Sequence, residues 1–179
     1  MNPLFLVGFM ASGKTTLGRA LAADLGRTFI DTDIYLESRY RQTIPMLFST
    51  RGEEGFRQLE RTILHEVADF EDVVIATGGG MPCFGDNMAY MNSHGTTVHL
   101  VCPTDVILTR LRLSRTPRPL VAGKTDDELR AYIDATLTAR NPFYMQAHHT
   151  FSSHQLESRE QIATSVARFR RDILGDVTC

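Results

Sequence analysis

The stretch from Gly8 to Thr15 (GFMASGKT) constrains the fold more than any other part of the chain, because it fits the pattern GxxxxGK[ST]. An apolar run at residues 4–7 precedes it and is typical of a buried strand. A helical pattern follows, with Leu17, Leu21 and Leu25 on one face. Between a strand and a helix, such a loop turns its backbone N–H groups around phosphate oxygens, and the helix N-terminus adds partial positive charge. The sequence therefore predicts a phosphate-binding loop.

Side chains of this loop have separate predicted roles. Lys14 can reach the β- and γ-phosphates of a nucleotide, and the Thr15 hydroxyl can ligate Mg²⁺. The residues predicted to contact the nucleotide are Ala11, Ser12, Gly13, Lys14, Thr15 and Thr16. The alternative is a chance glycine-rich turn, and the lysine, the hydroxyl and the flanking elements argue against it.

Apolar runs and helical patterns alternate along the rest of the chain. Further strands are expected at residues 28–31, 73–76, 97–101 and 150–151. Helices are expected at 33–40, from 43–45, at 53–69, from 103–104, at 125–140 and at 158–174, the last two opened by the capping boxes Thr125/Glu128 and Ser158/Gln161. This alternation predicts a parallel sheet covered on both faces, whose ligands bind beyond the carboxyl ends of the strands.

Composition limits the classes of function. The 179 residues carry a net charge of −2, so no general electrostatic attraction to nucleic acid or to an anionic membrane is expected. Cys83, Cys102 and Cys179 are too few and too widely spaced to indicate a disulfide framework or a zinc site. The apolar N-terminus has no basic segment before it, and no run approaches the length of a membrane span. We expect a single cytoplasmic domain that is a monomer.

Polar residues follow two further strands. Asp31 and Asp33 lie at the end of the second strand, where one carboxylate could hold Mg²⁺ through water and the other could face a substrate hydroxyl. The alternative is that Asp33 only caps the next helix. We favour the functional interpretation because we expect the phosphate-binding loop on the neighbouring strand. The third strand ends in Thr77 instead of the aspartate common in nucleotide-binding proteins, so Asp31 is the candidate for the missing carboxylate.

Glycines and arginines complete the set of candidate residues. Gly78, Gly79 and Gly80 permit a close approach of the backbone to a ligand; the alternative is a flexible turn, which a single glycine would already provide. Arg57 and Arg140 are candidate donors to a carboxylate, since the guanidinium group is forked and permanently charged. Arg118, in the proline-rich loop, fits an arginine that stabilises charge on a transferring phosphoryl group.

Together these residues are similar to the shikimate kinases, and the resemblance covers almost the whole chain. The matching segments are Gly8–Thr16, Asp31–Asp33, Ile44–Pro45, Gly55–Glu60, Thr77–Gly80, Arg118–Leu120 and Arg140–Tyr144. The resemblance implies a P-loop NTPase fold of three α/β/α layers with a central five-stranded parallel sheet, like that of the nucleoside monophosphate kinases, with a substrate-binding helical region at about 33–61 and a lid at about 113–124. It also implies phosphorylation of the shikimate 3-hydroxyl with ATP and Mg²⁺.

The resemblance assigns roles to individual residues. Asp33 would contact the shikimate hydroxyls and act as general base, and Arg57 and Arg140 would hold the shikimate carboxylate. Gly79, between Gly78 and Gly80, would contact the substrate. The metal would be shared between Thr15 and, through water, Asp31. Arg118 would belong to a mobile lid over ATP and, with Lys14 and Asp33, to the catalytic set.

Departures from the family's pattern leave some assignments open. Ala11 stands where the family usually has glycine, and a positive φ there would cost about 1 kcal/mol. The residue that stacks on adenine is either Arg110 or Arg112, and the adenine contact near residues 154–156 cannot be placed. Two other functions stay possible: another small-molecule or nucleoside monophosphate kinase on the same fold, or a non-catalytic nucleotide-binding module.

Overall fold

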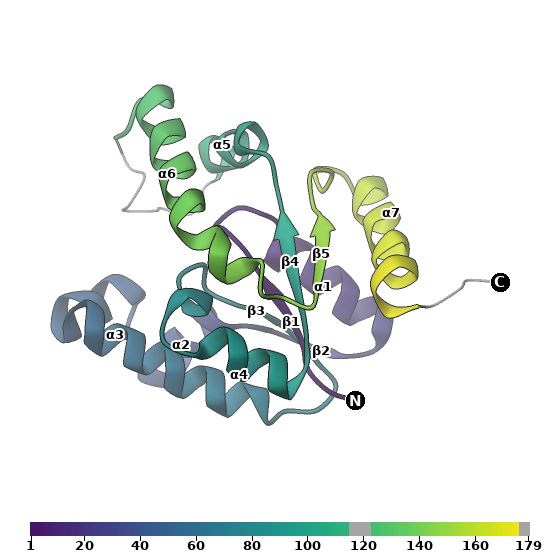
Figure 1. Ribbon diagram of the computed structural model, residues 1–179, viewed down its shortest axis with the longest axis horizontal. Helices are drawn as coiled ribbons and strands as arrows, with labels where there is room; N and C mark the ends of the chain where they lie inside the picture. The colour runs from purple at the N-terminus through teal and green to yellow at the C-terminus, as the bar shows by residue number, and fades with distance from the viewer. Residues whose placement is uncertain (115–122, 176–179) are drawn as a thin grey trace.

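A central parallel sheet organises the molecule (Figure 1). The computed structural model describes residues 1–114 and 123–175. The strands are β1 (Leu4–Val7), β2 (Thr28–Asp31), β3 (Val73–Ala76), β4 (Thr96–Val101) and β5 (His149–Ser152). They form one five-stranded sheet in the order β2-β3-β1-β4-β5, and every neighbouring pair is parallel. The predicted fold class, a five-stranded parallel α/β sheet, is therefore confirmed.

Helices connect the strands and cover both faces of the sheet. They are α1 (Lys14–Leu25), α2 (Thr32–Tyr40), α3 (Ile44–Ala68), α4 (Asn87–His94), α5 (Thr104–Leu113), α6 (Asp126–Tyr144) and α7 (Arg159–Phe169). A 3₁₀ turn, η1 (Met81–Cys83), follows β3, and a π-helical turn, η3 (Arg170–Leu174), continues α7. Figure 1 shows α7 beside β5 at one side of the sheet and α3 and α4 together below it.

The core follows from the alternation of side chains along the central strand. Phe5 and Val7 of β1 belong to a buried cluster with residues of α2, α3 and α4. Leu4 and Leu6 point to the opposite face and pack with residues of α1 and α7. A strand that is buried on both faces reads as a continuous apolar run, which is what residues 4–7 show.

Local signals in the sequence place several helix ends correctly. Thr125 and Glu128 form the predicted capping box at the start of α6, and Ser158 and Gln161 form the one at the start of α7. Gly26, the expected stop of α1, is its left-handed C-cap with φ 66°.

The two helices predicted in this region, one from 43–45 and one at 53–69, are both present, because α3 breaks at Gly52, where the backbone is non-helical (φ 67°, ψ 179°). Three other features differ from the predictions. Helix α4 and turn η1 were not predicted. Helix α6 continues past Arg140 to Tyr144 because Pro142 is tolerated inside it. Moreover, β3 lies between β1 and β2, so the expectation that Asp33 follows a strand adjacent to the phosphate-binding loop is wrong.

Among the helices formed by residues 1–114 and 123–175, none is both long and apolar enough to span a membrane.

Candidate active site

The phosphate-binding loop lies between β1 and α1 and holds its own lysine. Gly8 and Gly13 have positive φ angles of 140° and 100°, which glycine adopts without steric penalty. The Lys14 ammonium group is buried and donates hydrogen bonds to the carbonyl oxygens of Gly8, at 2.7 Å, and Phe9, at 2.8 Å. The cation is thereby placed inside the loop, at the N-terminus of α1, where a phosphate group binds most favourably.

Ala11 has the positive φ that we considered for this position of the loop. Its φ is 59°, so an alanine occupies the left-handed region. The Ala11 carbonyl oxygen accepts a hydrogen bond from Arg110 Nη1 at 3.3 Å, and the Ser12 carbonyl oxygen accepts one from the buried Ser153 hydroxyl at 2.7 Å. The loop is therefore tied both to α5 and to the segment that follows β5, and these contacts hold the strained residue in place.

Thr15 and Asp31 form an oxygen pair beside the loop. The Thr15 hydroxyl donates to Asp31 Oδ2 at 2.9 Å. Asp31 Oδ1 also accepts from the backbone N–H groups of Asp33 and Ile34, so Asp31 caps α2. Strand β2 ends at Asp31, so Asp31 and Asp33 do not share one strand face, and the capping role that we considered for Asp33 belongs to Asp31.

This pair suits Mg²⁺, which binds hard oxygen ligands. Within residues 1–114 and 123–175, no group of three or more His, Cys, Asp or Glu side chains is placed to hold a metal ion. Mg²⁺ is commonly bound through one or two protein oxygens together with substrate phosphates and water. A hydroxyl and a carboxylate at the edge of a phosphate-binding loop fit that mode of binding.

Each glycine of the Gly78–Gly80 turn lies against a different candidate side chain. A β-carbon built on Gly78 would lie 2.5 Å from Asp33 Oδ1, and one on Gly80 would lie 2.5 Å from Arg57 Nη1. A β-carbon on Gly79 would lie 3.4 Å from Arg140 Nη1. None of the three glycines has a positive φ. The turn therefore needs glycine at positions 78 and 80 for space and not for backbone conformation, whereas a β-carbon at position 79 would make only ordinary contacts.

Arg57 is fixed by a buried carboxylate and by two aromatic rings. Its Nη1 donates to Glu60 Oε2 at 2.5 Å, and its guanidinium carbon lies 6.0 Å and 5.7 Å from the ring centroids of Phe48 and Phe56. Glu60 is 3% exposed, and burial raises its pKa to about 7, although Arg57 opposes this shift. Asp33 and Glu60 are neighbours, because a β-carbon built on Gly78 would lie 2.5 Å from Asp33 Oδ1 and 3.2 Å from Glu60 Oε1, and Asp33 also raises the pKa of Glu60.

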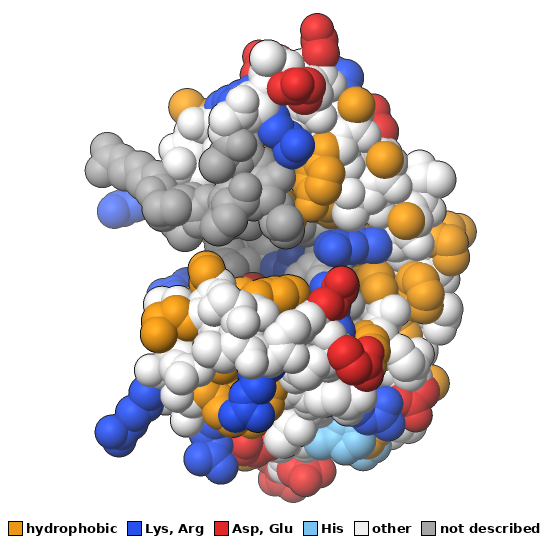
Figure 2. Space-filling model, turned by 90° about the vertical axis from the view of Figure 1, so that its left-hand side faces the viewer, with side chains coloured by type: hydrophobic (Ala, Val, Ile, Leu, Met, Phe, Trp, Pro, Cys, Tyr) orange, Lys and Arg blue, Asp and Glu red, His pale blue; other side chains and the backbone are white. Residues whose placement is uncertain are grey.

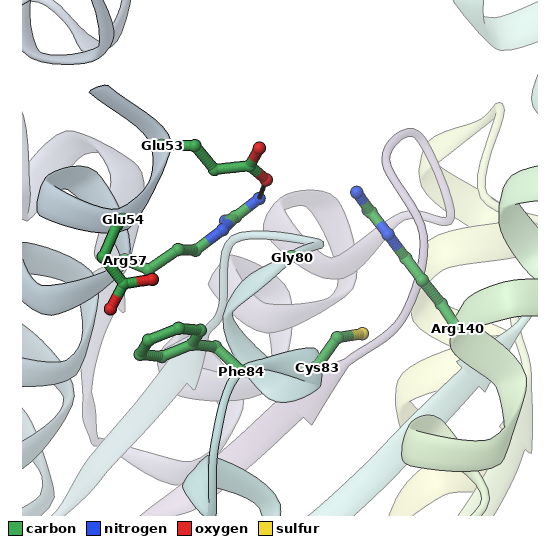
Figure 3. Close-up of a pocket in the computed structure, with 7 residues that line it drawn as sticks. All are labelled: Glu53, Glu54, Arg57, Gly80, Cys83, Phe84 and Arg140. Atoms are coloured by element: carbon green, nitrogen blue, oxygen red, sulfur yellow. Dashed lines mark ion pairs between the residues drawn. The ribbon is translucent and has the colours of Figure 1, made fainter.

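A pocket of about 390 Å³ opens between α3 and α6. Figure 3 shows Arg57 extending from α3 and Arg140 from α6 toward each other across it, with Gly80 between them and the Cys83 thiol beside Arg140. In the space-filling view the same side of the molecule is hollowed, with Lys and Arg side chains along the hollow (Figure 2). Glu53 and Glu54 also line the pocket, and Arg57 Nη2 lies 3.7 Å from Glu53 Oε1. Two guanidinium groups that face one cavity are suited to a small anion such as a carboxylate.

The structure separates the two arginines considered for the adenine contact. Arg110 bonds to Ala11 of the loop, to the Ser153 carbonyl oxygen at 2.9 Å and to Glu157 at 2.7 Å. Arg112 instead bonds to Asp126 at 2.7 Å and to the Lys124 carbonyl oxygen. Arg110 therefore borders the nucleotide loop, whereas Arg112 joins α5 to the start of α6. Arg118, and residues 115–122 of the predicted lid, lie outside the described residues.

Two residues of the site were not predicted from sequence. Glu60 occupies an apolar position of α3, between Phe56 and Ile63 on the buried face, and a charge at such a position was a usable signal. Tyr144 is fully buried, and its hydroxyl donates to the Gly79 carbonyl oxygen at 2.6 Å. Its position four residues after Arg140, on the same helix face, was the signal in that case.

The fold and the site together define a P-loop kinase with a site for a small anionic acceptor. A sequence model of the family described as shikimate kinase matches residues 10–170. The chain is 50% identical over 173 residues to the shikimate kinase of Phocaeicola vulgatus, covering 97% of this chain and 99% of that protein. The chain belongs to the shikimate kinase family.

Solved structures agree with this assignment. The shikimate kinase of Bacteroides thetaiotaomicron superposes with a TM-score of 0.93 at 52% identity, covering 95% of this chain and 97% of that one. The shikimate kinase of Acinetobacter baumannii, solved in complex with shikimate, superposes with a TM-score of 0.84 at 30% identity, covering 99% and 96% of the two chains.

Proposed function

We propose that this protein transfers the γ-phosphoryl group of ATP to the 3-hydroxyl of shikimate, giving shikimate 3-phosphate for the synthesis of aromatic amino acids. The observation that carries the proposal is the pair formed by Arg57 and Arg140 on opposite sides of one pocket, beside Asp33 and close to the phosphate-binding loop. Membership of the shikimate kinase family supports it.

On the acceptor side, each group has a distinct task. Arg57 and Arg140 bind the carboxylate of shikimate and so orient its ring. The Gly78–Gly80 backbone lines the pocket between them. Asp33, against Gly78, accepts the proton of the attacking hydroxyl. Orientation of the acceptor by two fixed cations reduces the entropy lost on the way to the transition state.

On the donor side, this chain's residues position and neutralise the phosphates. The loop from Ala11 to Thr16 binds them through backbone N–H groups, and Lys14 balances negative charge on the γ-phosphoryl group. Thr15 and, through water, Asp31 would hold Mg²⁺, which when bound neutralises charge on the β- and γ-phosphate oxygens. Arg118 completes the predicted set from the loop before α6.

For the adenine contact we favour Arg110 over Arg112. Arg110 bonds to the carbonyl oxygen of Ala11 and to the 153–157 segment, so one face of the nucleotide site is bordered by its guanidinium plane. A planar cation next to the phosphate-binding loop is suited to stack on a purine.

One assay distinguishes this function from its two alternatives. ATP consumption is measured with no acceptor, with shikimate, and with a panel of nucleoside monophosphates. Stimulation by shikimate alone supports the proposal. Stimulation by a nucleotide acceptor would show a nucleoside monophosphate kinase, and tight ATP binding without any acceptor-dependent turnover would show a non-catalytic binding module.

Asp33→Asn tests the assignment of the general base. The amide cannot accept the hydroxyl proton, so kcat should fall by about 10²-fold or more, while the Kd for ATP stays within about twofold. Asp69→Asn, at the exposed C-cap of α3, is the matched control and should leave kcat unchanged. Near-normal turnover of the Asp33 variant would remove Asp33 from the mechanism.

A further inference from the structure

Tyr144 has a polar contact that the proposed chemistry does not use. The residue is the last of α6, it is 0% exposed, and its hydroxyl donates to the Gly79 carbonyl oxygen at 2.6 Å. This bond joins positions that are 65 residues apart in the chain. A buried tyrosine that makes a specific hydrogen bond to a turn fixes the orientation of that turn.

The turn that it reaches is central to the acceptor pocket. A β-carbon added to Gly79 would lie 3.4 Å from Arg140 Nη1 and 3.5 Å from both the Gly8 carbonyl oxygen and the Met10 nitrogen. Gly79 thus lies where the acceptor arginine and the phosphate-binding loop come together.

Helix geometry links the same tyrosine to Arg140. The two residues are four apart on α6 and therefore lie on one face, one turn from each other. The Arg140 guanidinium group and the Cys83 thiol are close enough to the Tyr144 hydroxyl to influence its pKa. Burial, the largest effect, raises the pKa of Tyr144, so the hydroxyl keeps its proton and acts as a donor.

A second buried ring fixes Tyr144 from the side of the sheet. His99 of β4 lies 5.1 Å from the tyrosine ring between centroids. Burial, and then the Lys14 ammonium group, lower the pKa of His99 to about 4, so the imidazole is neutral near pH 7. The tyrosine is therefore clamped between a neutral ring and the glycine turn.

From these contacts we propose that Tyr144 is a positioning residue for the phosphoryl acceptor, which it serves by holding the Gly79 carbonyl and Arg140 in one fixed arrangement. The inference rests on the proposed function, because it takes shikimate as the acceptor. Its effect should fall on acceptor binding, since neither the Lys14 contacts nor the Thr15–Asp31 pair depends on the hydroxyl.

Tyr144→Phe tests the proposal because it removes one oxygen and keeps the ring in its place. The Gly79 carbonyl then loses its buried donor, and the turn is no longer held to α6. KM for shikimate should rise by about tenfold, while KM for ATP stays within about twofold and kcat within about threefold. Titration of shikimate without ATP should show the same tenfold weakening.

Tyr132→Phe is the matched control. Tyr132 lies three turns earlier on α6, in a cluster formed by α5 residues and Phe9 and outside the lining of the acceptor pocket, and loss of its hydroxyl alone should keep both KM values. Thermal unfolding of both variants shows whether they are folded at the assay temperature. Should Tyr144→Phe fail to fold, 3-fluorotyrosine at position 144 retains the hydroxyl and makes it a more acidic, stronger donor, so KM for shikimate should change while KM for ATP does not. Unchanged values of both would overturn the proposal.

The outcomes separate the inference from the function on which it rests. A wild-type protein without shikimate-dependent turnover would refute the proposed function. If the wild type is active and the Tyr144→Phe variant is folded but its KM for shikimate is unchanged, the positioning role is overturned and the proposed function stands. Equal losses in shikimate and ATP affinity would also overturn it, because they would indicate a general structural role.

Discussion

At the scale of single residues, Ala11 offers a direct test of strain in the phosphate-binding loop. Its φ of 59° is unfavourable for a residue with a β-carbon. Ala11→Gly should therefore raise the free energy of unfolding by about 0–0.5 kcal/mol, since relief of about 1 kcal/mol of strain is offset by about 0.5–1 kcal/mol of entropy that glycine loses on folding. Urea denaturation measures the change.

The control for this variant is Ala23→Gly, an exposed site on α1 where alanine has helical geometry. Glycine should destabilise that site by about 1 kcal/mol. A loss of stability in both variants would mean that the loop does not strain Ala11.

Glu60 makes stability depend on pH in a defined direction. Its pKa is raised from 4.5 to about 7, mainly by burial, so the folded state holds this proton more tightly than the unfolded state. The stabilising contribution is complete below pH 4.5 and is lost as pH rises to about 7. The loss amounts to at most about 1.4 kcal/mol per pH unit in that window.

Glu60→Gln removes this titration. As pH rises from 5 to 8, the Tm of the variant should therefore increase relative to the Tm of the wild type. Calorimetry measures both Tm values. Glu54→Gln, an exposed site on the same helix, should give a Tm–pH curve parallel to that of the wild type. A parallel curve for Glu60→Gln as well would show that Glu60 titrates normally.

At the scale of structural elements, the 78–80 turn should respond differently at each glycine. A methyl group at Gly80 collides with Arg57, so Gly80→Ala should raise KM for shikimate by tenfold or more, an effect of about 1.4 kcal/mol. A methyl group at Gly78 collides with Asp33, so Gly78→Ala should mainly lower kcat. Steady-state kinetics of the two variants measure kcat and KM for shikimate, and each variant is the control for the other. If both variants changed mainly KM, or both mainly kcat, the assignment of separate roles to the two positions would be wrong.

Elements with strong local signals were the predictable ones. Strand β1, the phosphate-binding loop and α1 follow one another with apolar periodicity and special backbone positions that the sequence shows directly. The starts of α6 and α7 were marked by capping boxes. These features depend on neighbours in the chain, which a sequence displays.

Elements that depend on tertiary contacts were missed. Helix α4 lacks a side-chain cap and is weakly amphipathic, and its place is set by Met88 and Met91 packing in the core. The position of β3 between β1 and β2 is a property of the sheet that no local pattern encodes. The same holds for the Tyr144–Gly79 bond.

At the scale of the whole molecule, the acceptor pocket draws its two cations from different parts of the chain. Arg57 comes from α3 and Arg140 from α6, so a bound carboxylate links the two sides. At about 100 times Kd, shikimate should stabilise the protein by about 2.7 kcal/mol and raise Tm by roughly 5–10 °C. Scanning fluorimetry measures the shift.

Arg57→Leu and Arg140→Leu should each remove most of that shift, because one remaining cation binds the carboxylate weakly. Arg61→Leu is the control: it lies one turn after Arg57 but pairs with Asp86 and should keep the full shift. A full shift in either pocket variant would exclude that arginine from acceptor binding.

The Gly78–Gly80 turn also limits which substitutions the enzyme can accept during evolution. Each of its three positions is held against a recognition side chain, so acquiring a side chain at 78 or 80 disturbs Asp33 or Arg57 at the same moment. An inhibitor that binds the backbone of this turn would contact atoms that no substitution removes, and a side chain introduced at 78 or 80 to block it would also impair the enzyme. Resistance by mutation at that surface would therefore carry a built-in loss of activity.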